Sequence, residues 1–194
     1  MSIDAAFTQF PIFTTSRLRL RQLQPSDAEA LFAIKSNPVV THAYGRTPHN
    51  SLDDTQAWME RIHGNYERRE GLVWAITFPD KDVVIGSVLL WNFDEDYRCG
   101  ELGYELDPAF WRQGIMVEAV PVVLRYVFAD LDLHRIEAVT SAENVPSSSL
   151  LLKLGFTLEG TLRQRQFFAG HYADQIYFGL LKAEWLKSAA ARVP

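Results

Sequence analysis

The segment from Glu101 to Val120, ELGYELDPAFWRQGIMVEAV, places a strand-like stretch directly before a helix-like one. The strand pattern ends at Pro108, an aromatic pair follows, and Gly114 opens an apolar run. The first N–H groups of a helix lack intrahelical partners, and together with the helix dipole they form a seat for an anion such as pyrophosphate. Gly114 allows close approach of such a ligand because it has no Cβ. A plain strand-to-helix connection has the same appearance, so both interpretations stay open at this point.

In the N-terminal part of the chain, the spacing of apolar residues and a capping pattern predict one strand and one helix. Residues 1–12 carry no pattern and are expected to trail along the surface. Alternation at Leu18 and Leu20 predicts a half-buried first strand. Ser26 with Glu29 three positions later is a capping-box pattern, which predicts a first helix.

The rest of the chain alternates between helical and strand-like stretches. Asn37–Asn50 holds two prolines and a glycine and is expected to be a loop, and Ser51 is expected to begin a second helix. Later elements are expected at Leu72–Phe78, Val83–Phe93, Arg98–Leu106, Ile115–Phe128, Arg135–Thr140, Ser147–Leu154, Phe156–Arg165 and Tyr172–Leu181, with a short final helix. A helix between two strands implies a crossover and a parallel pair. This order predicts an α+β fold, with one domain over residues 13–194.

Composition narrows the class of protein. A chain of 194 residues that is 47% apolar can bury a substantial core. Its single cysteine excludes an intramolecular disulfide framework, and its net charge of −5 argues against nonspecific binding to nucleic acid. No apolar run reaches the length of a membrane span and no signal peptide is recognised, so we expect a cytoplasmic protein without a membrane partner. The five histidines show no metal-ligand spacing, so no metal is expected.

A second segment, Asn144–Phe156, reads NVPSSSLLLKLGF and follows a strand-like RIEAVT. Together with the Glu101–Val120 segment it resembles the GNAT acetyltransferase superfamily. The likeness is closer to the branch of ribosomal-protein N-terminal alanine acetyltransferases, because similar phrases occur at Thr15–Arg21, Gly170–Asp174 and Leu180–Trp185. The resemblance covers Phe13 to Trp185.

The resemblance implies a fold, a co-substrate and an acceptor. The expected fold is a mixed, mostly antiparallel sheet of six to seven strands, splayed between two central parallel strands, with helices on both faces. Acetyl-CoA is the implied co-substrate, and a protein or peptide N-terminal amine is the leading acceptor. Alternatives are a polyamine, amino sugar, amino acid or toxic amine, or an acyl-CoA-binding domain without turnover. The oligomeric state stays open between monomer and homodimer.

The cofactor site follows from matching the family motifs to this sequence. The resemblance places the pyrophosphate on the turn formed by Trp111, Arg112, Gln113, Gly114, Ile115, Met116 and Val117. Trp111 stands at a position where the family has Gln or Arg. Met116 stands where a small residue is usual, so it is expected to add bulk close to the cofactor. Backbone donors do not depend on the side chain, so phosphate binding is expected to survive both departures.

The pantetheine arm and the thioester are expected to lie along the strand that precedes this turn. Backbone groups of Tyr104, Glu105 and Leu106 are expected to bind them and to polarise the carbonyl. Asn144 matches the family asparagine that contacts the arm. Alternatively, Asn144 caps the helix that follows it.

Two residues are candidates for catalysis. Glu101 could accept the ammonium proton directly or through a water, and little driving force is needed for an α-amine, whose pKa is about 8. Ser147 could donate a hydrogen bond to the departing sulfur. The alternatives are an exposed strand residue for Glu101 and a helix-start residue for Ser147.

Asp174 and Cys99 are weaker candidates. Asp174 matches an acidic position of the branch and could orient the substrate or fix the last hairpin. An acyl-cysteine at Cys99 is possible chemically, but a free cysteine usually behaves as a small apolar residue.

Overall fold

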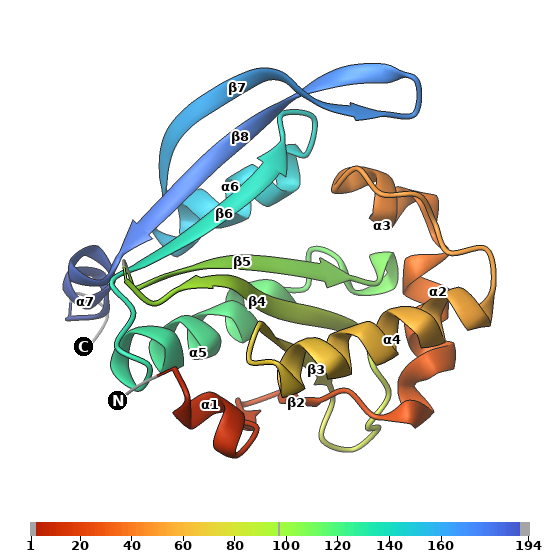
Figure 1. Ribbon diagram of the computed structural model, residues 1–194, viewed down its shortest axis with the longest axis horizontal. Helices are drawn as coiled ribbons and strands as arrows, with labels where there is room; N and C mark the ends of the chain where they lie inside the picture. The colour runs from red at the N-terminus through yellow and green to blue at the C-terminus, as the bar shows by residue number, and fades with distance from the viewer. Residues whose placement is uncertain (1–2, 97, 191–194) are drawn as a thin grey trace.

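The computed structural model describes residues 3–96 and 98–190, which form an eight-stranded sheet with helices on both faces (Figure 1). The strands are β1 (Phe13–Thr14), β2 (Arg19–Gln22), β3 (Gly71–Thr77), β4 (Gly86–Asp94), β5 (Cys99–Leu106), β6 (Arg135–Ser141), β7 (Thr157–Phe168) and β8 (His171–Leu181). The helices are α1 (Ala5–Thr8), α2 (Ala28–Lys35), α3 (Pro38–Ala43), α4 (Leu52–Glu67), α5 (Ile115–Ala129), α6 (Val145–Leu154) and α7 (Lys182–Ala190). Two 3₁₀ turns, Pro25–Asp27 and Pro108–Phe110, precede α2 and α5.

The sheet is mixed and mostly antiparallel, as expected. Its order is β1-β2-β3-β4-β5-β6-β8-β7, and β5 with β6 is the parallel pair. These two strands pair only from Cys99↔Arg135 to Glu101↔Glu137, and beyond that point they diverge (Figure 1). The sheet has eight strands where six or seven were expected, because the two-residue β1 adds an edge to β2.

Each face of the sheet is covered by its own helices. Successive residues of a strand point to opposite faces, so Trp74 and Ala75 of β3 enter different apolar clusters. The larger cluster lies under α5 and α6 and includes Val120 and Leu154. The smaller one lies under α2 and α4 and includes Ile34. β3 is buried on both faces, because the two clusters lie on opposite sides of it.

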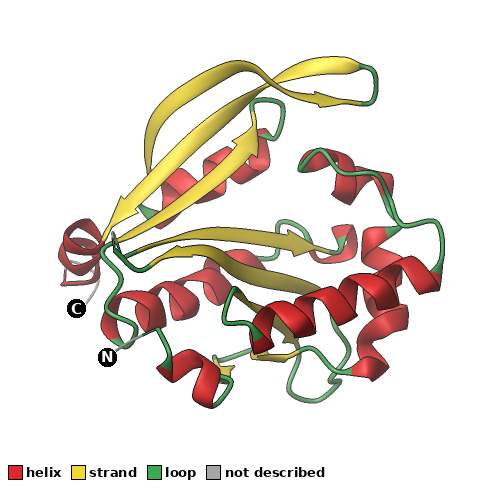
Figure 2. Cartoon of the chain, in the orientation of Figure 1, coloured by secondary structure: helices red, strands yellow, loops and turns green. Residues whose placement is uncertain are grey.

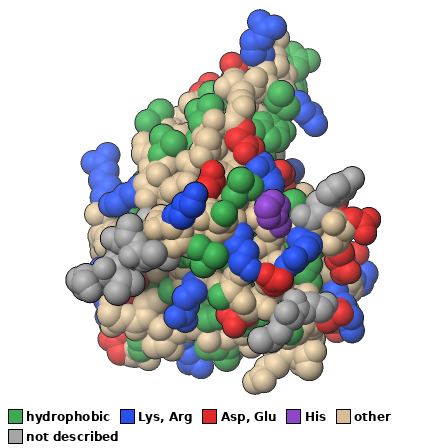
Figure 3. Space-filling view, turned by 90° about the vertical axis from the view of Figure 1, so that its left-hand side faces the viewer, with side chains coloured by type: hydrophobic (Ala, Val, Ile, Leu, Met, Phe, Trp, Pro, Cys, Tyr) green, Lys and Arg blue, Asp and Glu red, His purple; other side chains and the backbone are tan. Residues whose placement is uncertain are grey.

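The β7–β8 hairpin is the most extended part of the molecule (Figure 2). As expected, it turns through Ala169 and Gly170, both with positive φ. In the face that Figure 3 shows, acidic and basic side chains intermingle and neither sign dominates. Within the described residues, no helix is both long and apolar enough to span a bilayer.

Several helix boundaries are predicted well from local signals. Ser51 accepts a hydrogen bond from the Asp54 N–H, while Asp54 accepts one from the Ser51 N–H, so α4 begins with a capping box. Gly155 ends α6 in the left-handed conformation with φ 98°. Both features depend only on neighbouring residues.

Three other expectations are corrected by the structure. Of the residues 1–12 that were expected to trail along the surface, 1 and 2 lie outside the described residues, and residues 3–12 do not trail, because Ile3 and Ala6 are buried in the larger cluster. The capping box before α2 is built by Gln24 and Asp27, not by Ser26 and Glu29.

The third correction concerns Asn37–Asn50, which contains α3. Proline fits the first turn of a helix because the N–H it lacks would have no partner there. Asn37 supplies the N-cap by accepting a hydrogen bond from the Val39 N–H. The sequence interpretation took Pro38 as a loop residue and missed this helix.

Candidate active site

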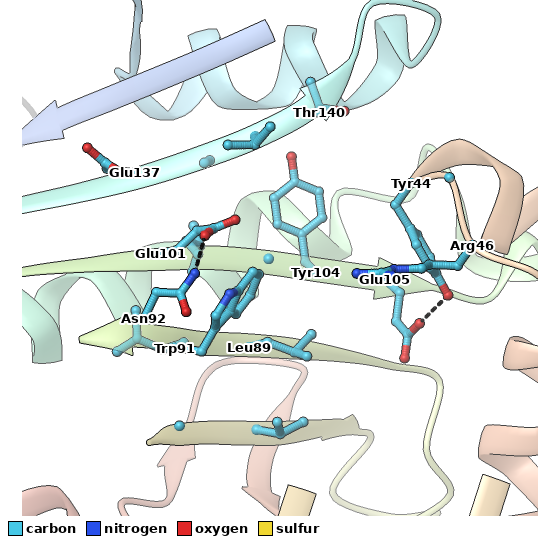
Figure 4. Close-up of a pocket in the computed structure, with 18 of the residues that line it drawn as sticks. Tyr44, Arg46, Leu89, Trp91, Asn92, Glu101, Tyr104, Glu105, Glu137 and Thr140 are labelled. Atoms are coloured by element: carbon cyan, nitrogen blue, oxygen red, sulfur yellow. Dashed lines mark hydrogen bonds between the residues drawn. The ribbon is translucent and has the colours of Figure 1, made fainter. Parts of the chain in front are cut away.

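A cleft of about 1630 Å³ opens where β5 and β6 diverge. Side chains of β4, β5 and β6 form its floor, and Figure 4 shows Glu101 and Tyr104 of β5 directed toward the space below β6. The α3 segment borders one end and the β7–β8 hairpin borders another (Figure 1). The predicted residues Glu101, Tyr104, Glu105, Asn144 and Ser147 all line this one cleft.

The turn before α5 has the backbone shape that an anion seat requires. Arg112 and Gly114 both have positive φ, 60° and 77°. The first intrahelical bond runs from the Glu118 N–H to the Gly114 carbonyl, so the N–H groups of residues 115–117 precede it. The Trp111 indole donates to the Leu106 carbonyl at 2.8 Å, which ties the turn to the end of β5.

Met116 does not lie where the sequence interpretation expected its bulk. Its side chain is 7% exposed and belongs to the larger apolar cluster. The adjacent Ile115 is also buried, whereas Arg112 and Gln113 face solvent. Steric bulk at Met116 would favour a domain that binds acyl-CoA without turnover, and the buried position of this side chain gives that alternative no support.

Tyr104 and Ser147 form a hydroxyl pair on the cleft wall. The Tyr104 Oη lies 2.8 Å from the Ser147 Oγ. Burial raises the pKa of Tyr104 to about 12, against the opposing effect of the Ser147 hydrogen bond. Sequence reasoning chose Tyr104 for its backbone and missed its phenol, because nothing in the strand pattern shows that β5 and α6 bring these groups together.

Asn144 uses both ends of its amide inside the protein. Its Oδ1 accepts from the Ser147 N–H at 3.1 Å, which caps α6. Its Nδ2 donates to the Ala43 carbonyl at 2.9 Å. The structure therefore supports the capping alternative and adds a contact to the end of α3.

Glu101 is a half-buried carboxylate at the point where β5 and β6 part (Figure 4). Burial raises its pKa, a hydrogen bond from Asn92 Nδ2 at 2.8 Å lowers it, and the negative charge of Glu137 raises it further. Asn92 has φ 51° in the irregular end of β4, which aims its amide at Glu101. The net rise places this carboxyl nearer to neutral pH than an ordinary glutamate.

Gly103, between Glu101 and Glu105 on the same strand face, leaves room for an aromatic ring. A Cβ at Gly103 would come within 2.6 Å of the Trp91 indole. The Trp91 indole of β4 therefore occupies the space beside Gly103 and lines the cleft. This glycine was not singled out from the sequence.

Glu105 is fully buried and held by three partners. Its carboxylate contacts Lys35 Nζ at 2.9 Å and accepts from Tyr44 Oη at 3.0 Å and Ser87 Oγ at 3.1 Å. Burial opposes ionisation, but Lys35 and the hydroxyl donors hold the pKa of Glu105 below its usual range. Lys35 also lies over the Trp58 ring, 3.7 Å from its centroid.

Asp174 lies outside the cleft. Its Oδ1 accepts from the Gln164 N–H at 2.7 Å, across the irregular pairing of β7 with β8. This contact supports the structural alternative, in which Asp174 fixes the hairpin.

Cys99 is a poor candidate for a nucleophile. Burial raises the pKa of the Cys99 thiol, which disfavours the nucleophilic thiolate. In the part of the chain that the structure describes, no group of three His, Cys, Asp or Glu side chains could hold a metal ion.

Comparisons with known proteins identify the family. A profile described as "Acetyltransferase (GNAT) domain" matches residues 17–157. The N-acetyltransferase YoaA of Bacillus subtilis, named as uncharacterized, is 37% identical over 89% of this chain and 98% of the relative. A spermidine N(1)-acetyltransferase of Vibrio cholerae is 27% identical over 88% of this chain and 96% of the relative.

Two further comparisons concern another relative and a solved structure, and the solved structure shows a likeness of fold alone. The ribosomal protein uS5-alanine N-acetyltransferase of Escherichia coli is 27% identical over 67% of this chain and 68% of the relative. The crystal structure of a Vibrio cholerae spermidine N-acetyltransferase with CoA and spermine superposes with a TM-score of 0.79 at 24% identity, covering 89% of this chain and 99% of that one. The profile match and the relatives show that this chain belongs to the GNAT family of N-acetyltransferases.

Proposed function

We propose that the protein transfers an acetyl group from acetyl-CoA to a primary amine, by direct attack within a ternary complex. The observation that carries the proposal is the position of Glu101, a carboxylate with a raised pKa on the floor of the cleft between β5 and β6. The pyrophosphate is assigned to the turn Trp111–Val117, and the thioester to the end of β5. The family's use of acetyl-CoA supports both assignments.

The first chemical step forms the C–N bond. The amine nitrogen attacks the thioester carbon, and Glu101 accepts the ammonium proton directly or through a water. Backbone N–H groups near Tyr104–Leu106 stabilise the oxyanion, as in other acyl transfers. Collapse of the tetrahedral intermediate then breaks the C–S bond and releases CoA.

The departing sulfur would be stabilised by the Tyr104–Ser147 hydroxyl pair. A phenol with a pKa of about 12 does not readily give its proton to a thiolate, because an ordinary thiol has a pKa of ~8.5. The pair is therefore assigned as a hydrogen-bond donor, with the free thiol formed later by proton exchange. This role includes Ser147, as the sequence suggested, and extends it to Tyr104.

The leading acceptor is a protein or peptide N-terminal amine. The name of the Escherichia coli relative supports it, and an α-amine needs only a weak base because its pKa is about 8. A small polyamine is the second candidate, supported by the name of the Vibrio cholerae relative, whose match spans more of both chains. We expect the reaction to take place in the cytoplasm.

Release of CoA thiol tests the proposal. Acetyl-CoA would be supplied with peptides that begin with alanine, with polyamines and with aminoglycosides, and the acetylated amine located by mass spectrometry. An α-acetylated peptide would support the leading acceptor, and acetylspermidine the second. Tight binding of CoA with no thiol release above hydrolysis for any amine would contradict the proposed transfer.

A further inference from the structure

The N-terminal phrase Thr15-Ser16-Arg17 packs against the first turn of α5. The Glu118 carboxylate accepts hydrogen bonds from the hydroxyls of Thr15 and Ser16 and from the Arg17 backbone N–H. It also pairs with the Arg17 Nε at 2.7 Å. Burial opposes ionisation of Glu118, but these donors hold its pKa below the usual range.

A second edge of the same guanidinium contacts the turn itself. The Arg17 Nη1 donates to the Gln113 carbonyl at 3.1 Å. This carbonyl lies directly before Gly114, where an anion is expected, and its oxygen would repel a phosphate if it were left bare. Arg17 therefore fixes the orientation of the Gln113 carbonyl and offsets the partial negative charge of its oxygen.

The remaining nitrogen of Arg17 lies beside Gly114. A Cβ built on Gly114 would come within 3.5 Å of the Arg17 Nη2. Nη2 makes no hydrogen bond to any residue that the structure describes, and the side chain is 48% exposed. A guanidinium held on two edges thus presents its third nitrogen at the mouth of the turn, in the planar arrangement that suits phosphate oxygens.

We propose that Arg17 is a further binding residue for the pyrophosphate of the acyl-CoA, contributed by the connection between β1 and β2 and not by the α5 motif. The inference rests on the proposed use of acetyl-CoA. A guanidinium at this position also explains why the Glu118 carboxylate can stand in the first turn of α5. Glu118 suits the helix dipole but would repel pyrophosphate, and Arg17 stands between them.

Two substitutions separate this role from a merely structural one. Arg17→Ala and Glu118→Gln both break the Arg17–Glu118 ion pair, but only Arg17→Ala removes the cation. By calorimetry, Arg17→Ala should weaken CoA binding about tenfold, which is the scale of one charge-assisted hydrogen bond. Glu118→Gln should change it by less than about twofold. Arg68→Ala, at the end of α4, controls for the loss of one surface charge.

The choice of ligand locates the contact. The tenfold loss should persist with 3′-dephospho-CoA, which keeps the pyrophosphate, and should vanish with pantetheine, which lacks it. Equal losses for Arg17→Ala and Glu118→Gln would show that Arg17 only supports the helix. A loss that disappears with 3′-dephospho-CoA would place the guanidinium at the 3′-phosphate. Either result overturns the inference and leaves acetyl-CoA use intact, whereas a wild-type protein that binds no CoA would overturn both.

Discussion

Glu101 and Glu105 stand on the same face of β5, yet their surroundings push their pKa values in opposite directions. Glu105 is enclosed by Lys35, Tyr44 and Ser87, which keep it ionised despite burial. Glu101 is half-buried near another carboxylate, Glu137, and among the described residues it accepts a side-chain hydrogen bond from Asn92. Separated pKa values of this kind distinguish a structural carboxylate from one that can exchange a proton. Glu101 is therefore the group whose titration should appear in the rate.

Glu101→Gln should lower kcat/KM at neutral pH by about 10²–10⁴-fold, the usual contribution of a general base. A base must be ionised, so the wild-type rate should fall as the pH drops through the raised pKa of Glu101. The variant should lack this acidic limb, and its deficit should shrink once the pH exceeds the pKa of the amine. A pH–rate profile with a fixed acceptor measures both effects.

Glu137→Gln is the matched control for this profile. Burial is the main cause of the raised pKa of Glu101 and the charge of Glu137 adds to it, so removing that charge should move the acidic limb slightly to lower pH with little loss at neutral pH. If the profile of Glu101→Gln overlays that of the wild type, Glu101 is not the base, and positioning with backbone oxyanion donors must account for the catalysis.

Glu105 yields a prediction about stability. Lys35→Met leaves a buried carboxylate without its cation, which should cost about 3–5 kcal/mol of unfolding free energy at pH 7. The double variant Lys35→Met/Glu105→Gln should recover part of it. The folded pKa of Glu105 is depressed in the wild type, so its contribution is present above about pH 4.3 and is lost as the pH falls through the folded value. The unfolding free energies of the three proteins, measured by urea titration, should therefore converge as the pH falls. A difference that stayed constant with pH would argue against the ion pair.

At the scale of elements, the first turn of α5 combines two features in one short stretch. It exposes N–H groups, while Ile115 and Met116 anchor the same turn in the core. The side chains of this segment thus serve packing, while its backbone is free for the proposed binding of pyrophosphate. A substitution in this turn can therefore be designed to affect either core packing or CoA binding.

Met116→Ala should affect packing alone. The side chain is buried, so its truncation should lower the unfolding free energy by roughly 2–5 kcal/mol. The N–H of residue 116 is unchanged, so CoA affinity measured well below the melting temperature should stay within about twofold. A large loss of affinity in a folded variant would mean that Met116 forms part of the pocket wall.

Gly114→Asp should affect binding. The residue has φ 77°, which costs any L side chain about 1 kcal/mol, and the added carboxylate would stand beside the pyrophosphate. It would also lie next to Arg17 Nη2 and compete with the ligand for it. CoA affinity should fall by more than tenfold, while Gly114→Ala, with the same strain and no charge, should lose much less. Equal affinities for wild type and Gly114→Asp would show that the turn is not the phosphate site.

Patterns of neighbouring residues predicted most of the helices and strands. Most of the site contacts that the sequence did not indicate join residues far apart in the chain. The turn at Gly114, the cap at Ser51 and the end of α6 at Gly155 each depend on residues a few positions apart. Tyr44 reaches Glu105 across 61 positions and Asn144 reaches Ala43 across 101, so no local pattern could indicate these contacts. For the same reason the phenol of Tyr104 and the role of Lys35 emerged only from the structure.

At the scale of the whole molecule, the segment Ala43–Gly45 bridges the two parts of the splayed sheet. Tyr44 Oη donates to Glu105 on β5, and the Ala43 carbonyl accepts from Asn144 at the start of α6. Gln166 of β7 lies against the Tyr44 and Gly45 carbonyls, 3.5 and 3.4 Å from its Nε2. The strands on either side of the cleft are therefore tied together at the end that α3 borders, where we expect the proposed acceptor to enter (Figure 1).

Tyr44→Phe should loosen this bridge without touching the CoA turn. The lost hydrogen bond goes to a carboxylate, so the unfolding free energy should fall by about 1.5–3 kcal/mol. Because the bridge borders the acceptor end of the cleft, KM for the amine should rise about three- to tenfold. The dissociation constant of CoA, measured by calorimetry, should stay unchanged. Hydrogen exchange at residues 38–46 should become faster.

Tyr66→Phe is the appropriate control, because it also removes one phenol hydroxyl, whose hydrogen bond to the Ala6 carbonyl lies away from the bridge. It should lower stability slightly and leave KM for the amine unchanged. If Tyr44→Phe raised the dissociation constant of CoA as much as KM, the bridge would act on the whole cleft and not on acceptor entry. If neither constant moved while exchange at residues 38–46 rose, the Tyr44–Glu105 contact would serve stability alone, and acceptor binding would depend on other walls of the cleft.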